Sequence, residues 1–422
     1  MLSAEDNEVL TRTGPGTPMG NLFRRYWIPA LESSDLPKPD CPPMRVKLLG
    51  ENLVAFRDSE GTIALLDEHC PHRRASLFFG RNEEGGLRCV YHGWKFDACG
   101  QCTDMPSEPE ESNFKDNVKI KAYPCKEYGG IIWTYMGPEE HMPELPPFQL
   151  GQLPESHRSV TRFLNECNYF QGIESAIDSS HISFLHRRKN DTPSKMQNVT
   201  HKFGNPKFEV IKTDYGMLIG AKRETDDPNT VYWRITQYIM PWYQMIPPIT
   251  LEASKANDVS LNCWIPVDDE HTMNWKIVWD PLYPLEGPGS RNGRHNGTIE
   301  KDPETHLQKA NKRNDYLIDR AVQASGKTFT GMPNIPVEDQ AMSESQGVIA
   351  DRSKEKLGTS DTAIIVGRRV LLDALKALER GDTPPGLDPV KINVQPVSIL
   401  LPADVPFLEG AKEYLVPEEI KL

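Results

Sequence analysis

The sequence predicts an α+β protein in which a small all-β domain is followed by a larger domain that combines an antiparallel sheet with helices. Up to about residue 150, short apolar runs alternate with turn-forming residues, as in a meander of short strands. Beyond that point, long strand patterns are followed by segments in which apolar residues recur at helical spacing. The 422 residues suffice for two domains, which we place at 1–150 and 151–422.

The first domain is expected to begin with irregular structure, because the chain up to about Pro43 is rich in glycine and proline. Strands are expected after it at residues 46–48, 53–56, 63–66, 87–91, 94–96 and 130–135, with a turn at 58–61. Prolines at positions 143, 146, 147 and 154 predict the linker that ends this domain.

The second domain is expected to open with a helix at residues 165–184, where Phe170, Ile173 and Ile177 share one helical face. Strand candidates follow at 208–222 with a turn at 214–216, at 231–240, and at 261–279 with a turn at 268–270. Helical patterns return at 305–324, 336–347 and 361–379. The proline-rich tail from Asp382 is expected to pack along the surface or against another subunit.

The charge balance excludes some classes of partner. Lys and Arg total 48 and Asp and Glu total 60, a formal charge of −12, so the chain has no general attraction to phosphate backbones or anionic lipid. Apolar stretches such as 131–133 and 397–401 fall far short of the roughly 18 residues that cross a bilayer. Residues 1–6 lack signal-peptide features. We therefore expect a cytoplasmic protein without a nucleic-acid or membrane partner.

The eight cysteines point to metal binding rather than to disulfides, which a cytosolic chain of this length does not need. The strongest signal is Cys70-Pro71-His72 followed, after sixteen residues, by Cys89-Val90-Tyr91-His92. Each half supplies one thiolate and one imidazole. A Rieske [2Fe–2S] cluster has two thiolates on one iron and two imidazoles on the other, and a tetrahedral zinc ion takes the same four ligands.

A further pair of cysteines, Cys99 and Cys102, has the spacing of a redox or zinc knuckle. It lies in a glycine-containing loop, and no helix is expected there that could lower a thiol pKa. We interpret this pair as structural.

Two histidines and an acid form a second constellation near the end of the expected 165–184 helix. Asp178 and His181 are three residues apart and share a helical face, whereas His186 would point elsewhere unless the helix ends or distorts. Non-haem iron that activates dioxygen is commonly held by two histidines and one carboxylate. On the residues alone, a polar cap or ion pairs with Glu174 and Asp178 are the commoner explanation of such histidines.

The stretches around both motifs are more specific than the motifs themselves. They are Cys70-Pro71-His72-Arg73, Tyr91-His92-Gly93-Trp94 with Lys95-Phe96, the run from Asn165 through Glu174 to His186, and the pattern from Gly358-Thr359-Ser360-Asp361 to Arg368-Arg369. They resemble the Rieske non-haem iron aromatic ring-hydroxylating oxygenases, in the phthalate dioxygenase-like branch of their α subunits. The resemblance covers most of the chain. It implies a Rieske [2Fe–2S] domain with an N-terminal extension at 1–150 and a catalytic mononuclear iron domain at 151–422.

The resemblance also implies the members of the two metal sites, which are Cys70, His72, Cys89 and His92 for the cluster and His181 and His186 for a mononuclear Fe(II). The third iron ligand is implied to be a carboxylate at the start of a late helix, where we choose Asp339 over Glu338. From the residues alone, acids after Pro336 would only favour a helix N-terminus. Asp178 is implied to be the catalytic bridge that accepts a hydrogen bond from a cluster histidine, carries the electron path and orients His181.

The activity implied by the resemblance is that of the oxygenase component of a multicomponent dioxygenase, which uses O2 to cis-dihydroxylate an aromatic carboxylate. The expected substrate is a phthalate isomer such as isophthalate or phthalate, or a substituted benzoate. Electrons would come from NADH through a separate flavin and iron–sulfur reductase. The α subunits would form head-to-tail homotrimers or stacked hexamers, in which the cluster of one subunit serves the iron of its neighbour through Asp178.

Substrate binding is expected at Lys207 and Gln244, which stand where the resemblance would place carboxylate-binding arginines. A lysine and an amide weigh against an ortho-dicarboxylate and suit a meta or para dicarboxylate or a substituted benzoate. The alternative function is a Rieske monooxygenase or O-demethylase that acts on an aromatic ether or benzoate. From other classes, an electron carrier would hold two irons per chain where the oxygenase holds three, and a pure binding module would hold none.

Overall fold

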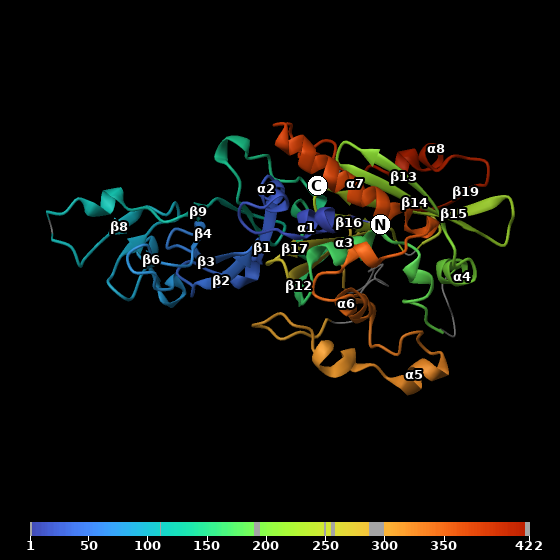
Figure 1. The fold of residues 1–422 in the computed structure, drawn as a ribbon, viewed down its shortest axis with the longest axis horizontal. Coiled ribbons are helices and arrows are strands. Elements are labelled where there is room, and N and C mark those ends of the chain that lie inside the picture. The colour runs from blue at the N-terminus through green and yellow to red at the C-terminus, as the bar shows by residue number, and fades with distance from the viewer. Residues whose placement is uncertain are drawn as a thin grey trace. The chain divides into compact units, whose positions relative to one another are not determined.

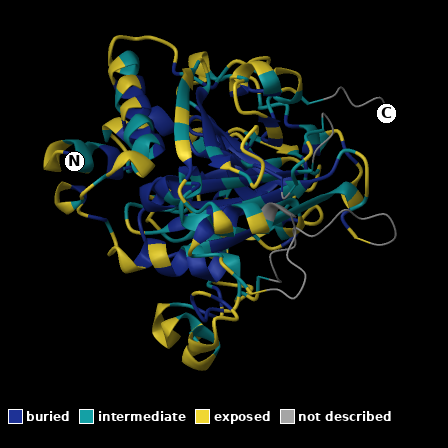
Figure 2. Ribbon diagram, turned by 90° about the vertical axis from the view of Figure 1, so that its right-hand side faces the viewer, coloured by how far each residue is buried: buried dark blue, intermediate teal, exposed yellow. Residues whose placement is uncertain are grey.

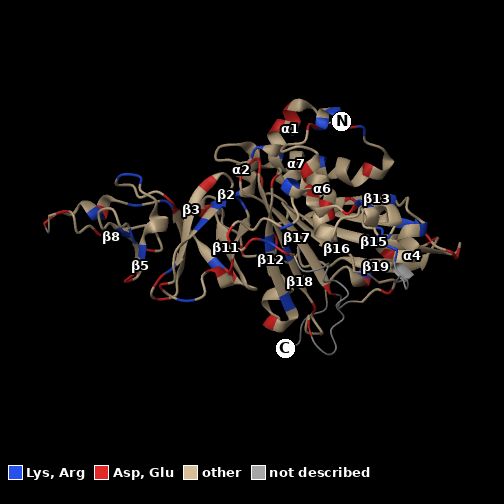
Figure 3. Cartoon of the chain, turned by 90° about the horizontal axis from the view of Figure 1, so that it is seen from below, with Lys and Arg blue, Asp and Glu red and all other residues tan. Residues whose placement is uncertain are grey.

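The computed structural model describes residues 2–109, 111–189, 195–248, 250–254, 258–286 and 299–417. Its contacts divide the chain into two compact units, Thr13–Leu145 and a larger one that joins Met1–Arg12 to Pro146–Leu422. The first unit thus ends five residues before the boundary expected at 150, and residues 1–12 belong to the second unit. Figure 3 shows acidic and basic residues interspersed along both units. The described part of the chain contains no helix that is long and apolar enough to span a membrane.

The smaller unit is built from short antiparallel strands, as the sequence predicts (Figure 1). Its three sheets have the orders β1-β11-β10, β2-β3-β4-β9 and β5-β6-β7-β8. Helix α2 (Pro18–Phe23) precedes strands β1 (Trp27–Glu32), β2 (Met44–Leu48), β3 (Glu51–Arg57), β4 (Ile63–Asp67), β5 (Arg81–Glu83), β6 (Gly86–Arg88), β7 (Lys95–Phe96), β8 (Cys102–Asp104), β9 (Ala122–Tyr123), β10 (Cys125–Tyr128) and β11 (Ile131–Tyr135).

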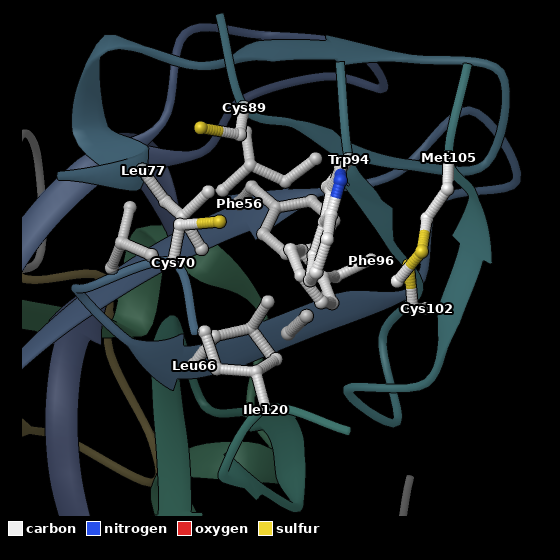
Figure 4. Packing of buried hydrophobic residues seen from close by; sticks show 13 residues of the cluster. Phe56, Leu66, Cys70, Leu77, Cys89, Trp94, Phe96, Cys102, Met105 and Ile120 are labelled. Atoms are coloured by element: carbon white, nitrogen blue, oxygen red, sulfur yellow. The ribbon is translucent and has the colours of Figure 1, made fainter. Parts of the chain in front are cut away.

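The core of the smaller unit contains the two cysteines of the first motif. Cys70 and Cys89 are 1% and 2% exposed, and they pack with Phe56, Leu77 and Trp94. Figure 4 shows the sulfur atoms of these two cysteines next to Leu77. The thiols therefore lie in an apolar setting, where burial of a thiolate is unfavourable without a cation or metal beside it.

The larger unit is centred on one antiparallel sheet in the order β12-β18-β17-β16-β15-β14-β13, and β19 pairs with β15 as well. Most of its strands are buried, and they form the dark blue centre of Figure 2. The strands are β12 (Arg158–Asn165), β13 (Lys207–Thr213), β14 (Gly216–Glu224), β15 (Thr230–Ile239), β16 (Tyr243–Ile246), β17 (Val259–Pro266), β18 (Thr272–Trp279) and β19 (Val397–Pro402). The hairpins β13-β14 and β17-β18 confirm the strand pairs and turns predicted at 208–222 and 261–279.

The helices of the larger unit pack against this sheet or against one another, and the second motif follows one of them. They are α1 (Ala4–Thr11), α3 (Tyr169–Ile177), α4 (Lys195–Lys202), α5 (Arg320–Ser325), α6 (Ile335–Ser345), α7 (Thr362–Glu379) and α8 (Phe407–Ala411). Helix α3 packs against β17, α6 and α7. Its close approach to β17 depends on Gly172, because a Cβ there would lie 2.0 Å from the ring of Trp264.

The prediction of irregular structure up to Pro43 is wrong, because α1, α2 and β1 all lie in that segment. Helices α1 and α2 both begin at a side-chain cap, a local signal that the content of glycine and proline does not reveal. The hydroxyl of Ser3 accepts a hydrogen bond from the amide of Asp6, and that of Thr17 accepts one from the amide of Gly20. Pro18 occupies the first turn of α2, where its missing N–H costs nothing.

Three other predictions of secondary structure need correction. The segment 165–184 is not one helix, because β12 runs to Asn165 and α3 ends at Ile177. The segment 305–324 contains only a short 3₁₀ stretch and the start of α5, because three consecutive residues from Asp315 have φ near +50°. The tail does not simply follow the surface, since β19 joins the sheet beside β15.

Candidate metal centres and active site

Two loops of the smaller unit share one backbone design and carry the residues of the first motif. In each loop, the amide of the fifth residue donates to the carbonyl of the cysteine, from Arg74 to Cys70 and from Gly93 to Cys89, both at 2.9 Å. Both donors have positive φ, 59° at Arg74 and 79° at Gly93, which turns the chain back sharply. The loops are therefore matched turns, each of which presents one thiol and one imidazole.

The side chains of the two loops meet. The rings of His72 and His92 lie 4.4 Å apart between centroids, and His72 stacks on Trp94 at 4.4 Å and 8°. A hydrogen bond with the Cys70 thiol lowers the pKa of Cys89 to about 6 against the effect of burial, and the same contact raises the pKa of Cys70. The structure thus brings together all four residues that the motif singled out.

The four side chains fit an iron–sulfur cluster. The Nδ1 atom of His92 is buried and has no hydrogen-bond partner in the described part of the chain, so it is available as a ligand atom. Cys70 and Cys89 are both free and buried. Two thiols and two imidazoles held at one place match the ligand set of a Rieske [2Fe–2S] cluster.

The second motif lies where α3 ends. The side chain of Asn168 caps the start of α3, and Asp178 follows its last residue with an extended backbone. The two carboxylate oxygens of Asp178 accept hydrogen bonds from the amides of Ser180 at 2.6 Å and His181 at 3.2 Å. This turn stops the helix and leads into a single 3₁₀ turn, His181–Ser183. His186 therefore need not continue the helical spacing.

His181, His186 and Asp339 form a cluster whose ligand atoms all lie within 4.8 Å of one another. The third member comes from the first turns of α6, far along the chain. Asp339 Oδ1 lies 3.1 Å from His186 Nε2 and 3.9 Å from His181 Nε2. Two histidines and one carboxylate that leave part of the coordination sphere open are the usual holders of non-haem Fe(II).

The chemistry of this cluster fits a cation. Asp339 Oδ1 is buried and has no hydrogen-bond donor within the described residues, although His186 Nε2 is near. Burial alone would raise the pKa of Asp339, but the charges of His186, His181 and Lys276 lower it, so the carboxylate is ionised. A buried anion and two imidazole nitrogens that face one point are arranged for a metal ion.

Each histidine of the cluster has a carboxylate at its other ring nitrogen. Asp178 Oδ2 lies 3.3 Å from His181 Nδ1, the contact through which the predicted orientation of His181 would act. Glu338 Oε2 lies 2.9 Å from His186 Nδ1. Glu338, which the sequence offered only as a rival to Asp339, contacts the other nitrogen of His186 instead. Neighbouring acids on a helix point about 100° apart, and that geometry could have suggested two different partners.

A cavity of about 190 Å³ adjoins the cluster. Its wall includes the three cluster residues, the ends of α3 and α4, and the sheet residues Arg234, Thr236, Ile246, Ser260, Asn262, Trp264 and Lys276. Among the described residues, Arg234 donates to the carbonyls of Pro247 and Pro248 and makes no ion pair, whereas Lys276 interacts with the charge of Asp339. The guanidinium of Arg234, which has no described acid as a partner, favours an anionic ligand in this cavity.

The structure does not bring the two predicted substrate residues to the wall of this cavity. Lys207 is exposed at the start of the edge strand β13. Gln244 is fully buried in β16, and both of its amide atoms lack a hydrogen-bond partner in the described part of the chain. It pairs across the sheet with Asn262, which does line the cavity. Arg234 and Lys276 line the cavity instead, and nothing in their local sequence distinguishes them from other strand residues.

Family models match both parts of the chain. Residues 26–124 match the Rieske [2Fe-2S] domain. Residues 134–400 match the family described as LigXa C-terminal domain like. The first match covers all four residues of the first motif, and the second covers the three cluster residues of the larger unit.

Curated relatives align along nearly the whole chain. The 3-chlorobenzoate-3,4-dioxygenase oxygenase subunit of Comamonas testosteroni is 39% identical, over 92% of this chain and 92% of that protein. The phthalate 4,5-dioxygenase oxygenase subunit of Pseudomonas putida is 38% identical, over 91% and 88%. The 5,5'-dehydrodivanillate O-demethylase oxygenase subunit of a Sphingobium species is 32% identical, over 100% and 91%.

Solved structures share the fold at lower identity. A QL mutant of Pseudomonas putida NdmA with theobromine superposes with a TM-score of 0.59 at 21% identity, over 85% of this chain and 92% of that one. The likeness agrees with the predicted succession of a β-rich domain and a sheet-and-helix domain.

Proposed function

The chain belongs to the Rieske aromatic ring-hydroxylating oxygenases as an α subunit, and we propose that it cis-dihydroxylates an aromatic carboxylate with O2. We propose that the electrons come from NADH through a separate flavin and iron–sulfur reductase, and that the protein works in the cytoplasm. The observation that carries the proposal is the cluster of His181, His186 and Asp339 at the wall of a cavity.

The residues of the two sites are assigned as follows. We propose that Cys70, His72, Cys89 and His92 hold the Rieske cluster and that His181, His186 and Asp339 hold mononuclear iron. When bound, these groups supply single electrons and the activation of O2. Asp178 holds His181 by its Nδ1 atom, and the cavity holds the aromatic ring against the open side of the iron site.

The cations of the cavity support a carboxylate substrate. The relatives from Comamonas and Pseudomonas are named for 3-chlorobenzoate and phthalate, both aromatic carboxylates. A volume of about 190 Å³ is somewhat larger than the roughly 150 Å³ in which an apolar cavity takes up benzene. We infer a single-ring substrate whose carboxylate binds Arg234 or Lys276, in place of the exposed Lys207.

Arg234→Met is expected to raise the KM for benzoates and phthalate isomers with little change in kcat, because the lost contact serves binding rather than the reaction itself. A hydrogen bond to a charged group contributes about 1.5–3 kcal/mol, so kcat/KM should fall roughly 10- to 150-fold. Lys212→Met, which removes an exposed cation on β13, is the control. Equal effects of the two substitutions would contradict the proposed role of the cavity cation.

A second cavity of the larger unit supports association with other copies of the chain. This groove of about 920 Å³ is lined by Asp178, His181 and two phenylalanines that are each 53% exposed, Phe184 and Phe329. In the smaller unit, Tyr91 beside His92 is 53% exposed. We propose that the groove receives the cluster loops of another copy in a head-to-tail homotrimer or stacked hexamer, with Asp178 accepting a hydrogen bond from a cluster histidine. A holoenzyme that is monomeric in solution would contradict this.

The alternative is a monooxygenase or O-demethylase that acts on an aromatic ether or benzoate. The similarity to the Sphingobium O-demethylase subunit extends over 100% of this chain and favours it. The metal residues do not discriminate between the two reactions, because both require the same iron site.

Labelled dioxygen separates the two functions. The holoenzyme, a reductase and NADH are incubated with phthalate isomers, benzoates and their methyl ethers under ¹⁸O₂, and the products are analysed by mass spectrometry. We expect a cis-dihydrodiol that contains two labelled oxygen atoms. A product with one labelled atom, or loss of the ether methyl group, would assign the chain to the alternative function.

A further inference from the structure

Glu338 is a fully buried carboxylate in the first turns of α6, and three side chains hold it. One oxygen, Oε2, accepts a hydrogen bond from Nδ1 of His186 at 2.9 Å. The other, Oε1, accepts from the guanidinium of Arg188 at 3.2 Å and from the hydroxyl of Thr330 at 2.6 Å. Both oxygens of this anion are therefore committed to neighbours, which fixes the plane of the carboxylate.

The contact with Nδ1 determines what His186 can do with its other nitrogen. A histidine that donates its Nδ1 proton to a carboxylate keeps the lone pair of Nε2 free for a metal ion. Nε2 of His186 lies 3.1 Å from Asp339 Oδ1, at the candidate iron site. The contact to Glu338 thus selects the tautomer and the ring orientation that the iron site needs.

Glu338 cannot itself be a third or fourth ligand of the same ion in this arrangement. Glu338 Oε2 lies 2.9 Å from Nδ1 of His186, whereas Asp339 Oδ1 lies 3.1 Å from Nε2, and both oxygens of Glu338 already accept hydrogen bonds. The two acids act on the two ring nitrogens of one histidine.

The other histidine has a weaker holder. Asp178 lies 3.3 Å from Nδ1 of His181, its side chain is 21% exposed, and its oxygens also serve the amides of Ser180 and His181. The distance from Glu338 to Nδ1 of His186 is shorter, at 2.9 Å, and the side chain of Glu338 is fully buried. Removal of Glu338 should therefore weaken metal binding at the iron site without affecting the proposed electron path through Asp178.

We propose that Glu338 is the positioning residue of the iron site, which fixes His186 through Nδ1 and is itself fixed by Arg188 and Thr330. The proposal rests on the assignment of the iron ligands under the proposed function. It adds a residue that touches neither the substrate nor the metal ion and that determines how tightly the metal is held.

The test is metal affinity. Holoenzyme is depleted of mononuclear iron under anaerobic conditions with its cluster intact, and Co(II) is titrated in while the visible absorption of the bound ion is followed. Loss of a carboxylate behind a ligating histidine typically lowers metal affinity 10- to 100-fold. We expect Glu338→Gln to raise the Kd for Co(II) by that factor and to shift the Co(II) bands, while the spectrum of the Rieske cluster stays unchanged.

A matched control lies in the same helix. Glu344 is also buried, and it accepts hydrogen bonds from the amide of Glu166 and from Gln340 and Tyr316. Glu344→Gln should weaken the fold comparably and leave the Kd for Co(II) unchanged. Thr330→Val, which removes only the hydroxyl that holds Glu338, should raise the Kd a few-fold, less than Glu338→Gln.

Two results would overturn the proposal. Wild-type affinity and an unshifted Co(II) spectrum in Glu338→Gln would show that His186 needs no such support. An equal loss of Co(II) affinity in Glu344→Gln would show that the loss in Glu338→Gln results from general destabilisation of α6. Failure of the wild-type chain itself to bind Co(II) would instead refute the iron site, and with it the proposed function.

Discussion

His181→Ala is expected to abolish oxygenation while the visible spectrum of the iron–sulfur cluster remains that of the wild type. His181 contributes one of three candidate iron ligands, and it is also the residue that Asp178 holds. The four candidate ligands of the iron–sulfur cluster belong to the smaller unit, so the substitution should not affect them. Metal analysis should fall from about three to about two irons per chain, because a [2Fe–2S] cluster accounts for two.

The matched control is His271→Ala, which also removes an imidazole from the larger unit. His271 contacts Asp268 at 2.9 Å in the turn before β18, and it does not line the cavity. This variant should keep three irons and full turnover. A wild-type chain with only two irons would favour the electron-carrier hypothesis. Undiminished oxygenation in His181→Ala would show that the reaction takes place at another site.

Glu174→Gln is expected to lower the free energy of unfolding of the larger unit by about 3–5 kcal/mol, the usual cost of removing one partner from a buried ion pair. Glu174 in α3 accepts hydrogen bonds from Arg352 at 2.9 Å and from Arg368 of α7 at 2.7 Å, and Arg368 also pairs with Glu355. Burial would lower the pKa of Arg368, but the charges of Glu174 and Glu355 raise it. Glutamine would leave two buried guanidinium groups with one carboxylate.

The same substitution at the surface provides the control. Glu300 pairs with Lys309 at 2.9 Å, and both side chains are more than 60% exposed. Glu300→Gln should change stability by no more than about 1 kcal/mol. Urea denaturation followed by circular dichroism compares the two variants. If they unfold at the same urea concentration, the buried network does not stabilise α3.

The sequence singled out residues that the structure brings together where they lie within one short motif. Cys70 and His72, or Cys89 and His92, lie within one turn of each other, so their spacing indicates a metal site, whereas the flanking residues favour the Rieske cluster over zinc. Asp339 is more than 150 residues from His186 and was inferred only from the resemblance to a family, because no local pattern distinguishes it from an acid that favours a helix N-terminus.

The rest depended on tertiary contacts that periodicity cannot report. The helix predicted at 165–184 ends at Ile177 because Asp178 caps the turn with its side chain, which apolar spacing does not reveal. Glu338 acquires its role from His186, 152 positions away. Lys207 shared its residue type with the lysine that does reach the cavity, Lys276, and only the pairing of the strands separates the two.

The absence of a side chain at Gly172 has a consequence for the range of molecules the enzyme can accept. Trp264 forms part of the cavity wall, and a Cβ at position 172 would lie 2.0 Å from its indole. Any larger residue must displace either the indole or the helix, and either movement alters the width available to a bound ring. A substitution at position 172 is therefore expected to change the width of the cavity through Trp264, although residue 172 does not itself line it.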